Sequence, residues 1–457
     1  MTTQSPTNSN ATMTNFTRKE FLRTSAMAGI GLGLLPMAGA RGEVRRQTVR
    51  IGLVGVGARG TGHLRGLLVR DDVEIPAVCD VDQANLDRAV RLVEEAGHPR
   101  PEGYTGSDSA WEGLVSREDL DGVIISTPWL FHTPIAVAAM EHGMYVGSEI
   151  PTALTMEDCW NLVRTSERTG SPLMQLENVC YRRDVMAVLQ IAREGLLGTL
   201  LHARCGYRHD LRDFLFDRDV RFGPGTGSVS SWRTQHYIHQ NRDLYPNHGI
   251  GPVAHWLDIN RGNRFLTLTS AATKSAGLQQ YIREEGGADN PHREQEFRQG
   301  DVVTTMLTTA NGETVIVTHD TSGPRPYSLD FQLQGTRGLW LNDRDGIHIE
   351  GRSEPHRWED FADYHAEHDS ALWRRHEEEA VGSGHGGMDF FIRHAFVESV
   401  KRQVQPPIDV YDAATWSAIG PLSEDSIALG SQTLEFPDFT GGRWTTNERI
   451  FYVHDEY

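Results

Sequence analysis

The stretch Gly55-Val56-Gly57-Ala58-Arg59-Gly60 follows the apolar run Val49–Val54, and Asp80 comes twenty residues after Gly60. In a strand–turn–helix unit the first glycine permits the tight turn, the second lets the backbone approach a pyrophosphate, and the third lets the helix pack on the strand. The N-terminus of that helix also presents free N–H groups to phosphates. Asp80 ends the apolar run Val73–Cys79, where a carboxylate accepts hydrogen bonds from ribose hydroxyls. No basic residue follows Asp80 directly, so the pattern predicts a site for NAD rather than NADP.

Residues 49–147 alternate apolar runs with amphipathic segments, which predicts a parallel sheet with helical crossovers. Further strands are expected at 123–127, 145–147 and 173–176, and helices at 135–142 and 155–169. Ligands of such sheets bind beyond the carboxyl ends of the strands. The residues expected to converge on that crevice are Arg59, Asp80, Thr127–His132, Glu149 and Asn178.

The pattern changes after Asn178. A helix is expected at 179–194, and strand-like runs follow at 200–205, 302–308, 314–319, 329–334, 340–341 and 347–349. The predicted fold class is α/β: an N-terminal Rossmann dinucleotide-binding domain (44–177), then a C-terminal α+β domain (178–405) with an open, largely antiparallel sheet. Residues 208–242 read as a long functional loop, 382–387 as a flexible connection, 388–404 as a helix, and 406–457 as an extension that packs back on the domains.

Residues 1–43 have the features of an export signal. The string Thr17-Arg18-Lys19-Glu20-Phe21-Leu22-Arg23 precedes the apolar stretch Ala26–Met37, and small residues suited to cleavage follow at Ala38-Gly39-Ala40. The string resembles a twin-arginine signal with Lys19 in place of the second arginine. We therefore expect an exported, periplasmic or extracellular protein, with general secretion and an uncleaved anchor as the alternatives.

The composition and charge of the chain bear on nucleic-acid binding, disulfide formation and metal binding. The formal net charge is -18 and no basic block lies outside the signal, so a nucleic-acid-binding surface is not expected. The four cysteines show no metal-ligand spacing and read as buried thiols, although a disulfide after export stays open. Twenty histidines form no evident ligand cluster, so no metal is expected.

Three strings carry a family resemblance. Glu149-Ile150-Pro151 stands where oxidoreductases of the Gfo/Idh/MocA superfamily carry Glu-Lys-Pro, and Ile150 cannot act as their lysine does. Tyr245-Pro246-Asn247-His248-Gly249 followed by Asp258-Ile259-Asn260-Arg261-Gly262 resembles the signature of the NAD-dependent glycosidases of family 109, known for α-N-acetylgalactosaminidase activity, with Asn247 in place of threonine. Trp129-Leu130-Phe131-His132-Thr133-Pro134 resembles another string of that family, with two positions changed.

This resemblance implies a redox-assisted hydrolysis in which NAD oxidises C3 of the sugar, the glycosidic bond breaks by elimination, water adds and the hydride returns. It implies Tyr245 and His248 as the catalytic pair, with their division of labour left open. The residues implied to bind substrate are Tyr207, Arg233, Tyr245, Pro246, Asn247, His248 and Tyr327. Those implied to bind the cofactor are Gly55, Gly57, Arg59, Gly60, Asp80, Trp129, His132, Glu149, Ile150 and Asn178.

Two other functions stay open at this point. One is a periplasmic NAD-dependent sugar dehydrogenase that uses His255 or His248 as its base, and the other is a non-catalytic sugar-binding protein that retains NAD. His255 is equally compatible with a hydrogen-bonded helix residue. Asp258 and Arg261 are expected to pair one turn apart on a helix. A homo-oligomer through the open sheet face is expected by analogy with the superfamily.

Overall fold

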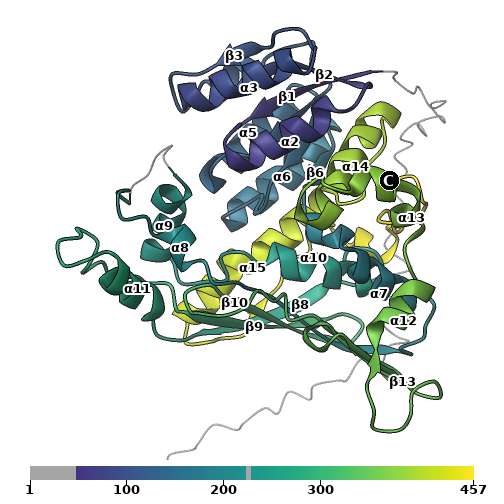
Figure 1. Cartoon of the computed structure of the whole chain (residues 1–457). Coiled ribbons are helices and arrows are strands. Elements are labelled where there is room, and N and C mark those ends of the chain that lie inside the picture. The colour runs from purple at the N-terminus through teal and green to yellow at the C-terminus, as the bar shows by residue number, and fades with distance from the viewer. Residues whose placement is uncertain (1–47, 223–227) are drawn as a thin grey trace, which may run out of the picture. The chain divides into compact units, whose positions relative to one another are not determined.

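The computed structural model describes residues 48–222 and 228–457, and the predicted export segment at 1–43 lies outside the described residues (Figure 1). None of the helices in these two ranges is long and apolar enough to cross a membrane.

A six-stranded parallel sheet forms the first half of the described chain, in the order β3-β2-β1-β4-β5-β6. Its strands are β1 (Val49–Val54), β2 (Val73–Cys79), β3 (Glu102–Tyr104), β4 (Gly122–Ile125), β5 (Tyr145–Ser148) and β6 (Leu173–Gln175). Its helices are α2 (Ala58–Leu68), α3 (Gln83–Glu95), α4 (Trp111–Val115), α5 (His132–Glu141) and α6 (Met156–Thr169). The strand order reverses between β1 and β4, which is where ligands bind in such sheets. The predicted Rossmann sheet is confirmed.

The turn from β1 into α2 depends on glycines that have no room for a side chain. Gly55 has a φ of 84°, and a Cβ on it would lie 2.6 Å from the carbonyl oxygen of Ser126. A Cβ on Gly60 would lie 1.9 Å from the carbonyl oxygen of Gly55, so α2 packs directly on the turn. A Cβ on Gly57 would meet only the Asn85 side chain, at 3.9 Å, so this face of the turn is open to a ligand.

The second sheet has nine strands in the order β14-β13-β12-β11-β7-β10-β9-β8-β15. Its strands are β7 (Leu200–Arg208), β8 (Phe265–Ala272), β9 (Val302–Thr309), β10 (Thr314–Asp320), β11 (Gln332–Gly335), β12 (Gly338–Leu341), β13 (Gly346–Ile349), β14 (Glu359–Asp360) and β15 (Leu434–Glu435). All neighbours are antiparallel except β7 and β10. The prediction of a largely antiparallel sheet is confirmed, although β8 was missed because threonine and small residues weaken its apolar alternation.

Helices of the second half lie between and around the two sheets. They are α7 (Arg183–Arg193), α8 (Arg212–Leu215), α9 (Val229–His239), α10 (Asn247–Trp256), α11 (Gly277–Glu285), α12 (Phe361–Glu367), α13 (Ala371–Ala380), α14 (Met388–Arg402) and α15 (Val410–Ala428). The single helix expected at 179–194 is wrong: a 3-10 turn, η3 (Asn178–Tyr181), is separated from α7 by Arg182 in an extended conformation. The loop expected at 208–242 contains α8 and α9.

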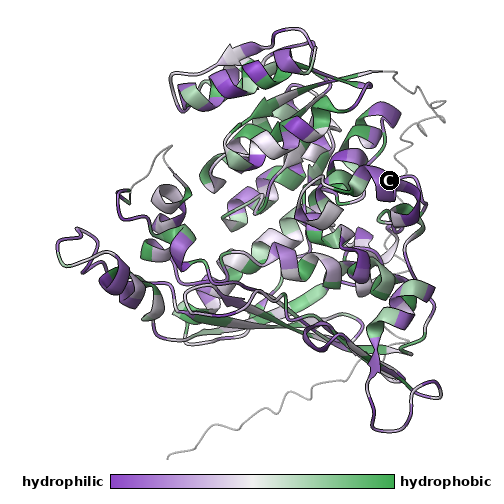
Figure 2. Cartoon of the chain, in the orientation of Figure 1, coloured by the Kyte–Doolittle hydropathy of each residue, from purple (hydrophilic) through white to green (hydrophobic). Residues whose placement is uncertain are grey.

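Helix α15 joins the two halves. It packs on α6 and β6 of the first sheet and on β8 of the second, and it also touches α10 (Figure 1). Figure 2 shows mainly hydrophobic residues in β1 and hydrophilic residues on much of α11, in keeping with their burial and exposure. All four cysteines are buried free thiols, and burial raises the pKa of the Cys79 thiol to about 12.

We expect Gly60→Ala to lower the free energy of unfolding by about 1–3 kcal/mol and to weaken NAD retention, because the added methyl forces α2 away from the turn. Gly62→Ala is the matched control: it lies in the same helix with no atom near its Cβ position, so it should stabilise the protein by up to about 1 kcal/mol. Chemical denaturation with NAD analysis checks both. Equal stability of the two variants contradicts the close packing.

Candidate active site

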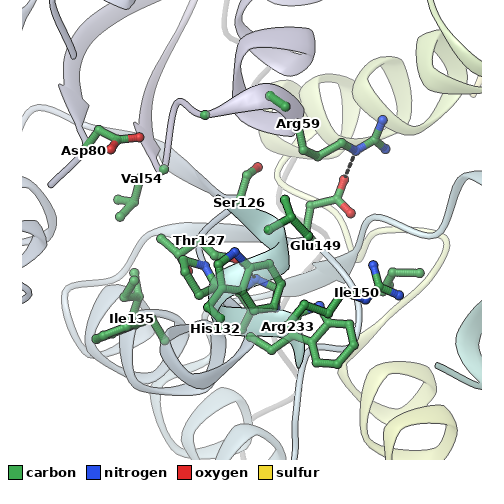
Figure 3. Close-up of a pocket in the computed structure, with 18 of the residues that line it drawn as sticks. Val54, Arg59, Asp80, Ser126, Thr127, His132, Ile135, Glu149, Ile150 and Arg233 are labelled. Carbon is green, nitrogen blue, oxygen red and sulfur yellow. Dashed lines mark hydrogen bonds and ion pairs between the residues drawn. The ribbon is translucent and has the colours of Figure 1, made fainter. Parts of the chain in front are cut away.

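One cavity of about 660 Å³ brings together residues from both halves of the chain (Figure 3). The Rossmann half contributes the fingerprint turn and the carboxyl ends of its strands. The second half contributes side chains from β7, α8, α9, α10 and the glycine-rich loop before α14. A ligand in this cavity therefore contacts the dinucleotide fingerprint and the predicted catalytic residues at once.

The Rossmann side of the cavity has the features that NAD requires. The Asp80 carboxylate lines it and is held by the backbone amides of Val56 and Asp82, at 2.8 and 2.9 Å. Ser126, Thr127 and Asn178 line it, and among the described residues the two hydroxyls and the Asn178 Oδ1 atom are buried without a hydrogen-bond partner. These unsatisfied groups and the open face of Gly57 fit a bound dinucleotide. Residues of this wall that the sequence reading missed are Asn85, Ser107, Asp108 and Trp111.

Arg59 and Glu149 line the cavity, but their charged groups face each other. The Arg59 Nε donates to the Glu149 Oε1 at 2.5 Å (Figure 3), and His63 Nε2 lies 2.7 Å from the same oxygen. Burial acts to raise the pKa of Glu149, but the Arg59 guanidinium and His63 outweigh it and lower that pKa to about 2. Glu149 is therefore an anion at every working pH. The Arg59 guanidinium is engaged in ion pairs within the chain.

His132 and Ile150 complete the cofactor side. The His132 ring nitrogens lie 2.8 Å from the carbonyl oxygens of Pro151 and Thr127. The ring therefore lies between the segments that follow β5 and β4. Burial lowers its pKa. Ile150 is buried in the cavity wall, so no amine stands at this position.

The opposite wall of the cavity consists of aromatic side chains around the buried Arg233. The Arg233 guanidinium lies 4.7 Å from the Trp129 ring centroid and 4.8 Å from that of Tyr245. Arg233 is 7% exposed, and its Nε and Nη2 atoms have no hydrogen-bond partner within the part of the chain that the structure describes. The Tyr207 ring packs at 4.8 Å from Tyr245. Aromatic faces and a guanidinium with unused donors suit a sugar that carries a carbonyl or several hydroxyls.

His248 is held by a carboxylate that the sequence reading missed. Its Nδ1 lies 2.7 Å from Oε1 of Glu177, a fully buried residue two positions after the end of β6. Because a carboxylate accepts hydrogen bonds, Glu177 keeps the ring proton of His248 on Nδ1. The lone pair is then on Nε2, and His248 lines the cavity. Burial raises the pKa of the neighbouring Tyr245 phenol well above its usual range, so that phenol stays protonated.

A third cavity histidine, after His132 and His248, lies on the glycine-rich loop. His385 begins the short 3-10 turn η5 (His385–Gly387), where Gly384, Gly386 and Gly387 all have positive φ. Its Nδ1 lies 2.8 Å from Asp389 Oδ2, and this hydrogen bond raises the pKa of His385. Its side chain is 61% exposed. The signal in the sequence was the string Gly-Ser-Gly-His-Gly-Gly, read there only as a flexible connection.

Comparisons with known proteins bear on both halves. Residues 49–176 match the oxidoreductase family with an NAD-binding Rossmann fold, and residues 181–446 match the glycosyl hydrolase 109 C-terminal domain. A glycosyl hydrolase family 109 protein of Stenotrophomonas maltophilia is 48% identical over 453 residues, covering 96% of this chain and 99% of that protein. The chain belongs to glycosyl hydrolase family 109.

Two further similarities are informative. A Tannerella forsythia protein named alpha-N-acetylgalactosaminidase is 45% identical, covering 95% of this chain and 99% of that protein. A solved levoglucosan dehydrogenase in complex with NADH has a TM-score of 0.63 at 19% identity, covering 86% of this chain and all of that one, and so shares the fold. The family 109 enzyme described here is thus a glycosidase that uses NAD.

Several predicted residues lie outside the cavity of this family 109 enzyme. Pro246 and Asn247 do not line it, and the Asn247 amide is buried with no hydrogen-bond partner among the described residues. Tyr327 is 51% exposed, with its ring 6.4 Å from that of Tyr207. His255 is a core residue that stacks on Phe451 at 4.0 Å, and burial lowers its pKa to about 3.

The predicted pairing of Asp258 with Arg261 is wrong. Asp258 has a positive φ beyond the end of α10 and pairs with Arg449, whereas Arg261 donates to Asp412 of α15. The helix that one-turn spacing requires ends before Asp258. In the described ranges, no three His, Cys, Asp or Glu side chains gather as metal ligands.

We expect Glu177→Gln to lower turnover by about 10²–10⁴-fold while NAD stays bound, because a neutral amide no longer stabilises the positive charge that His248 acquires when it takes a proton. The Gln oxygen can still accept the Val179 amide, so the fold survives. Steady-state kinetics and the NAD content of the purified protein check this. Turnover equal to that of the control Glu435→Gln, on exposed β15, contradicts the role.

Proposed function

We propose that this family 109 enzyme hydrolyses terminal α-N-acetylgalactosaminides, with NAD recycled in each turnover. The observation that carries the proposal is the single cavity that joins the dinucleotide fingerprint to His248, Tyr245 and Arg233. The unused donors of Arg233 suit the carbonyl of an acetamido group. The name of the Tannerella forsythia relative supports the choice of sugar.

When bound, NAD supplies reversible removal of hydride from a ring carbon of the sugar, which acidifies the neighbouring C–H and lets the glycosidic bond break by elimination. Side chains of the protein accept and donate the protons. His248 is the base, since Glu177 leaves its Nε2 lone pair free for a hydroxyl or C–H proton of the sugar. Tyr245 stays protonated because of its burial and donates a hydrogen bond to the oxygen of the reacting carbon.

The leaving oxygen needs an acid, and His385 fills that role. The Asp389 carboxylate holds a proton on its imidazole, and the glycine-rich loop places that ring at the cavity wall. After it gives up the proton, the same imidazole can take one from the water that adds. Because the acid must be protonated, turnover should fall as pH rises through the raised pKa of His385.

The buried Ile150 offers no proton acceptor, so loss of the hydroxyl proton, which must accompany hydride removal in a hydrolase as well as in a dehydrogenase, falls to His248. Because hydrolysis is redox-neutral overall, we expect no net NADH.

We expect the purified enzyme to release nitrophenol from p-nitrophenyl α-N-acetylgalactosaminide without stoichiometric NADH. His385→Ala should slow the methyl glycoside by about 10²–10⁴-fold and the p-nitrophenyl glycoside far less, because nitrophenolate leaves without a proton. Simultaneous absorbance records of nitrophenol and NADH, with chromatography for the methyl glycoside, measure both.

Steady NADH accumulation with free sugar contradicts the hydrolase proposal and favours the dehydrogenase. Equal slowing of the two glycosides removes His385 from the acid role. His248→Ala is the reference variant, since loss of the base should abolish turnover of both substrates with NAD still bound.

We also propose that residues 1–43 direct export of the folded, NAD-loaded enzyme. The support is the basic string at 17–23, the apolar stretch at 26–37 and the small residues at 38–40. A cofactor that returns its hydride every cycle needs no supply outside the cytoplasm.

Replacing both Arg18 and Lys19 by Gln should leave the enzyme in the cytoplasm of its host, because the basic string is what the export machinery reads. Arg65→Gln, an exposed charge on α2, is the matched control and should leave export unchanged. Activity and NAD content in cytoplasmic and exported fractions measure the outcome. Unchanged export of the double variant refutes the proposal.

A further inference from the structure

The loop that carries His385 is attached to the Rossmann half by a chain of charged hydrogen bonds. Asp389 Oδ2 lies 2.8 Å from His385 Nδ1 and accepts from Arg59 Nη1 at 2.7 Å. The Arg59 Nε donates at 2.5 Å to Glu149, directly after β5. One guanidinium thus bridges two carboxylates, one on each half of the chain.

The carboxylate at the centre of this chain is firmly held. The Asp389 side chain is 5% exposed, and its second oxygen accepts from the Asn178 Nδ2 at 2.8 Å. The burial of Asp389 acts to raise its pKa, but His385 and Arg59 outweigh it and hold the pKa well below its usual range. Asp389 is therefore charged, and its position is fixed by Arg59 and Asn178.

The ionisable groups around His385 come from several elements. Arg59 and His63 come from α2, Glu149 from the end of β5, and Asp389 and Arg393 from α14. Arg182, Arg183 and Glu377 line a second pocket together with His385. The Arg393 Nη2 also donates to the carbonyl oxygen of Ser383 in the loop, at 3.0 Å. His63 is fully buried and its pKa is lowered, so the cations on the α2 and α14 side of His385 are Arg59 and Arg393.

The loop itself cannot fix the imidazole. Gly384, Gly386 and Gly387 have positive φ, and glycine-rich backbone is the most conformationally free. The position of His385 therefore depends on its side-chain hydrogen bond to Asp389 and on Arg59, whose Nη1 lies 2.7 Å from Asp389 Oδ2 and 3.4 Å from His385 Nδ1.

We propose that Arg59 is a positioning residue for His385, acting through Asp389, and that its side chain serves this role rather than binding the cofactor phosphates that its place in the fingerprint predicts. The proposal rests on the proposed function, in which His385 is the acid. The backbone of Arg59 remains at the N-terminus of α2, where phosphates are expected. In the first turn of α2, the backbone amides are thus available to the cofactor phosphates, and the Arg59 side chain positions the acid His385.

The electrostatic consequence can be measured. Arg59 shares Asp389 Oδ2 with His385, and its positive charge lowers the pKa of His385 against the larger effect of Asp389. Removing that charge in Arg59→Met should move the titration of His385 upward. Arg59→Lys keeps the positive charge, but a single ammonium group cannot bridge Asp389 and Glu149 as the forked guanidinium does. The titration of His385 should therefore stay unchanged, while the His385 ring loses its orientation.

The experiment titrates the histidine rings of the full-length holoenzyme by NMR after ¹³C-histidine labelling. The His385 signal is the one missing in His385→Gln. We expect an upward shift of its titration in Arg59→Met, none in the exposed-charge control Arg65→Met, and full NAD content in both. For Arg59→Lys we expect an unchanged titration, with kcat for the methyl glycoside lowered by about 10–100-fold and KM little changed.

An unchanged His385 titration in Arg59→Met overturns the proposal, and loss of NAD in the same variant assigns the side chain to the cofactor instead. If Arg59→Met does not fold, Arg59→Lys decides, and wild-type kcat in that variant refutes the positioning role. A wild-type enzyme that hydrolyses no glycoside refutes the proposed function, while the NMR titration still reports whether Arg59 acts on His385.

Discussion

The buried ion pairs of Arg261 hold the active-site helix in place. Arg261 follows α10, the helix that carries His248, and donates to both Asp412 oxygens of α15 at 2.7 and 2.9 Å. Its Nη2 also lies 2.9 Å from Asp409 Oδ2. Helix α15 in turn packs on α6 and β6 of the Rossmann sheet. Breaking one such buried pair costs about 3–5 kcal/mol, because a charge is left without a partner. The distance between the cofactor crevice and His248 depends on this attachment.

The parts that the sequence predicts well are those fixed by local sterics. Gly60 is required by its contact with Gly55 within one turn, Gly55 is required by its positive φ, and Asp80 is expected where the second apolar run ends. The partners of Arg261 and His248 lie far along the chain, at Asp412 and Glu177, and no spacing rule points to them. His385 was overlooked for a different reason: glycines around a histidine also suit a mere connection. Its function depends on Asp389, which only the fold places beside it together with Arg59.

Histidine chemistry in this protein is decided by the surroundings of each ring. His248 and His385 both have a carboxylate beside Nδ1, but the His248 side chain is 17% exposed and packs against Tyr207 and Tyr245, whereas that of His385 is 61% exposed on a loop. Burial lowers the pKa of His236 to about 4 and that of His319 to about 3, so both stay neutral near pH 7. The same side chain thus serves as the proposed base, as the proposed acid and as inert packing within one molecule.

The burial of the four cysteines affects how the folded protein responds to oxidants and reductants. Oxidants and thiol-exchange enzymes react with exposed thiolates. Burial raises the pKa of Cys79 to about 12 and keeps Cys180 and Cys205 protonated, so the folded chain presents almost no reactive sulfur. Once folded, the protein needs neither reductant nor disulfide formation to stay intact. It should therefore tolerate reducing and oxidising surroundings equally well.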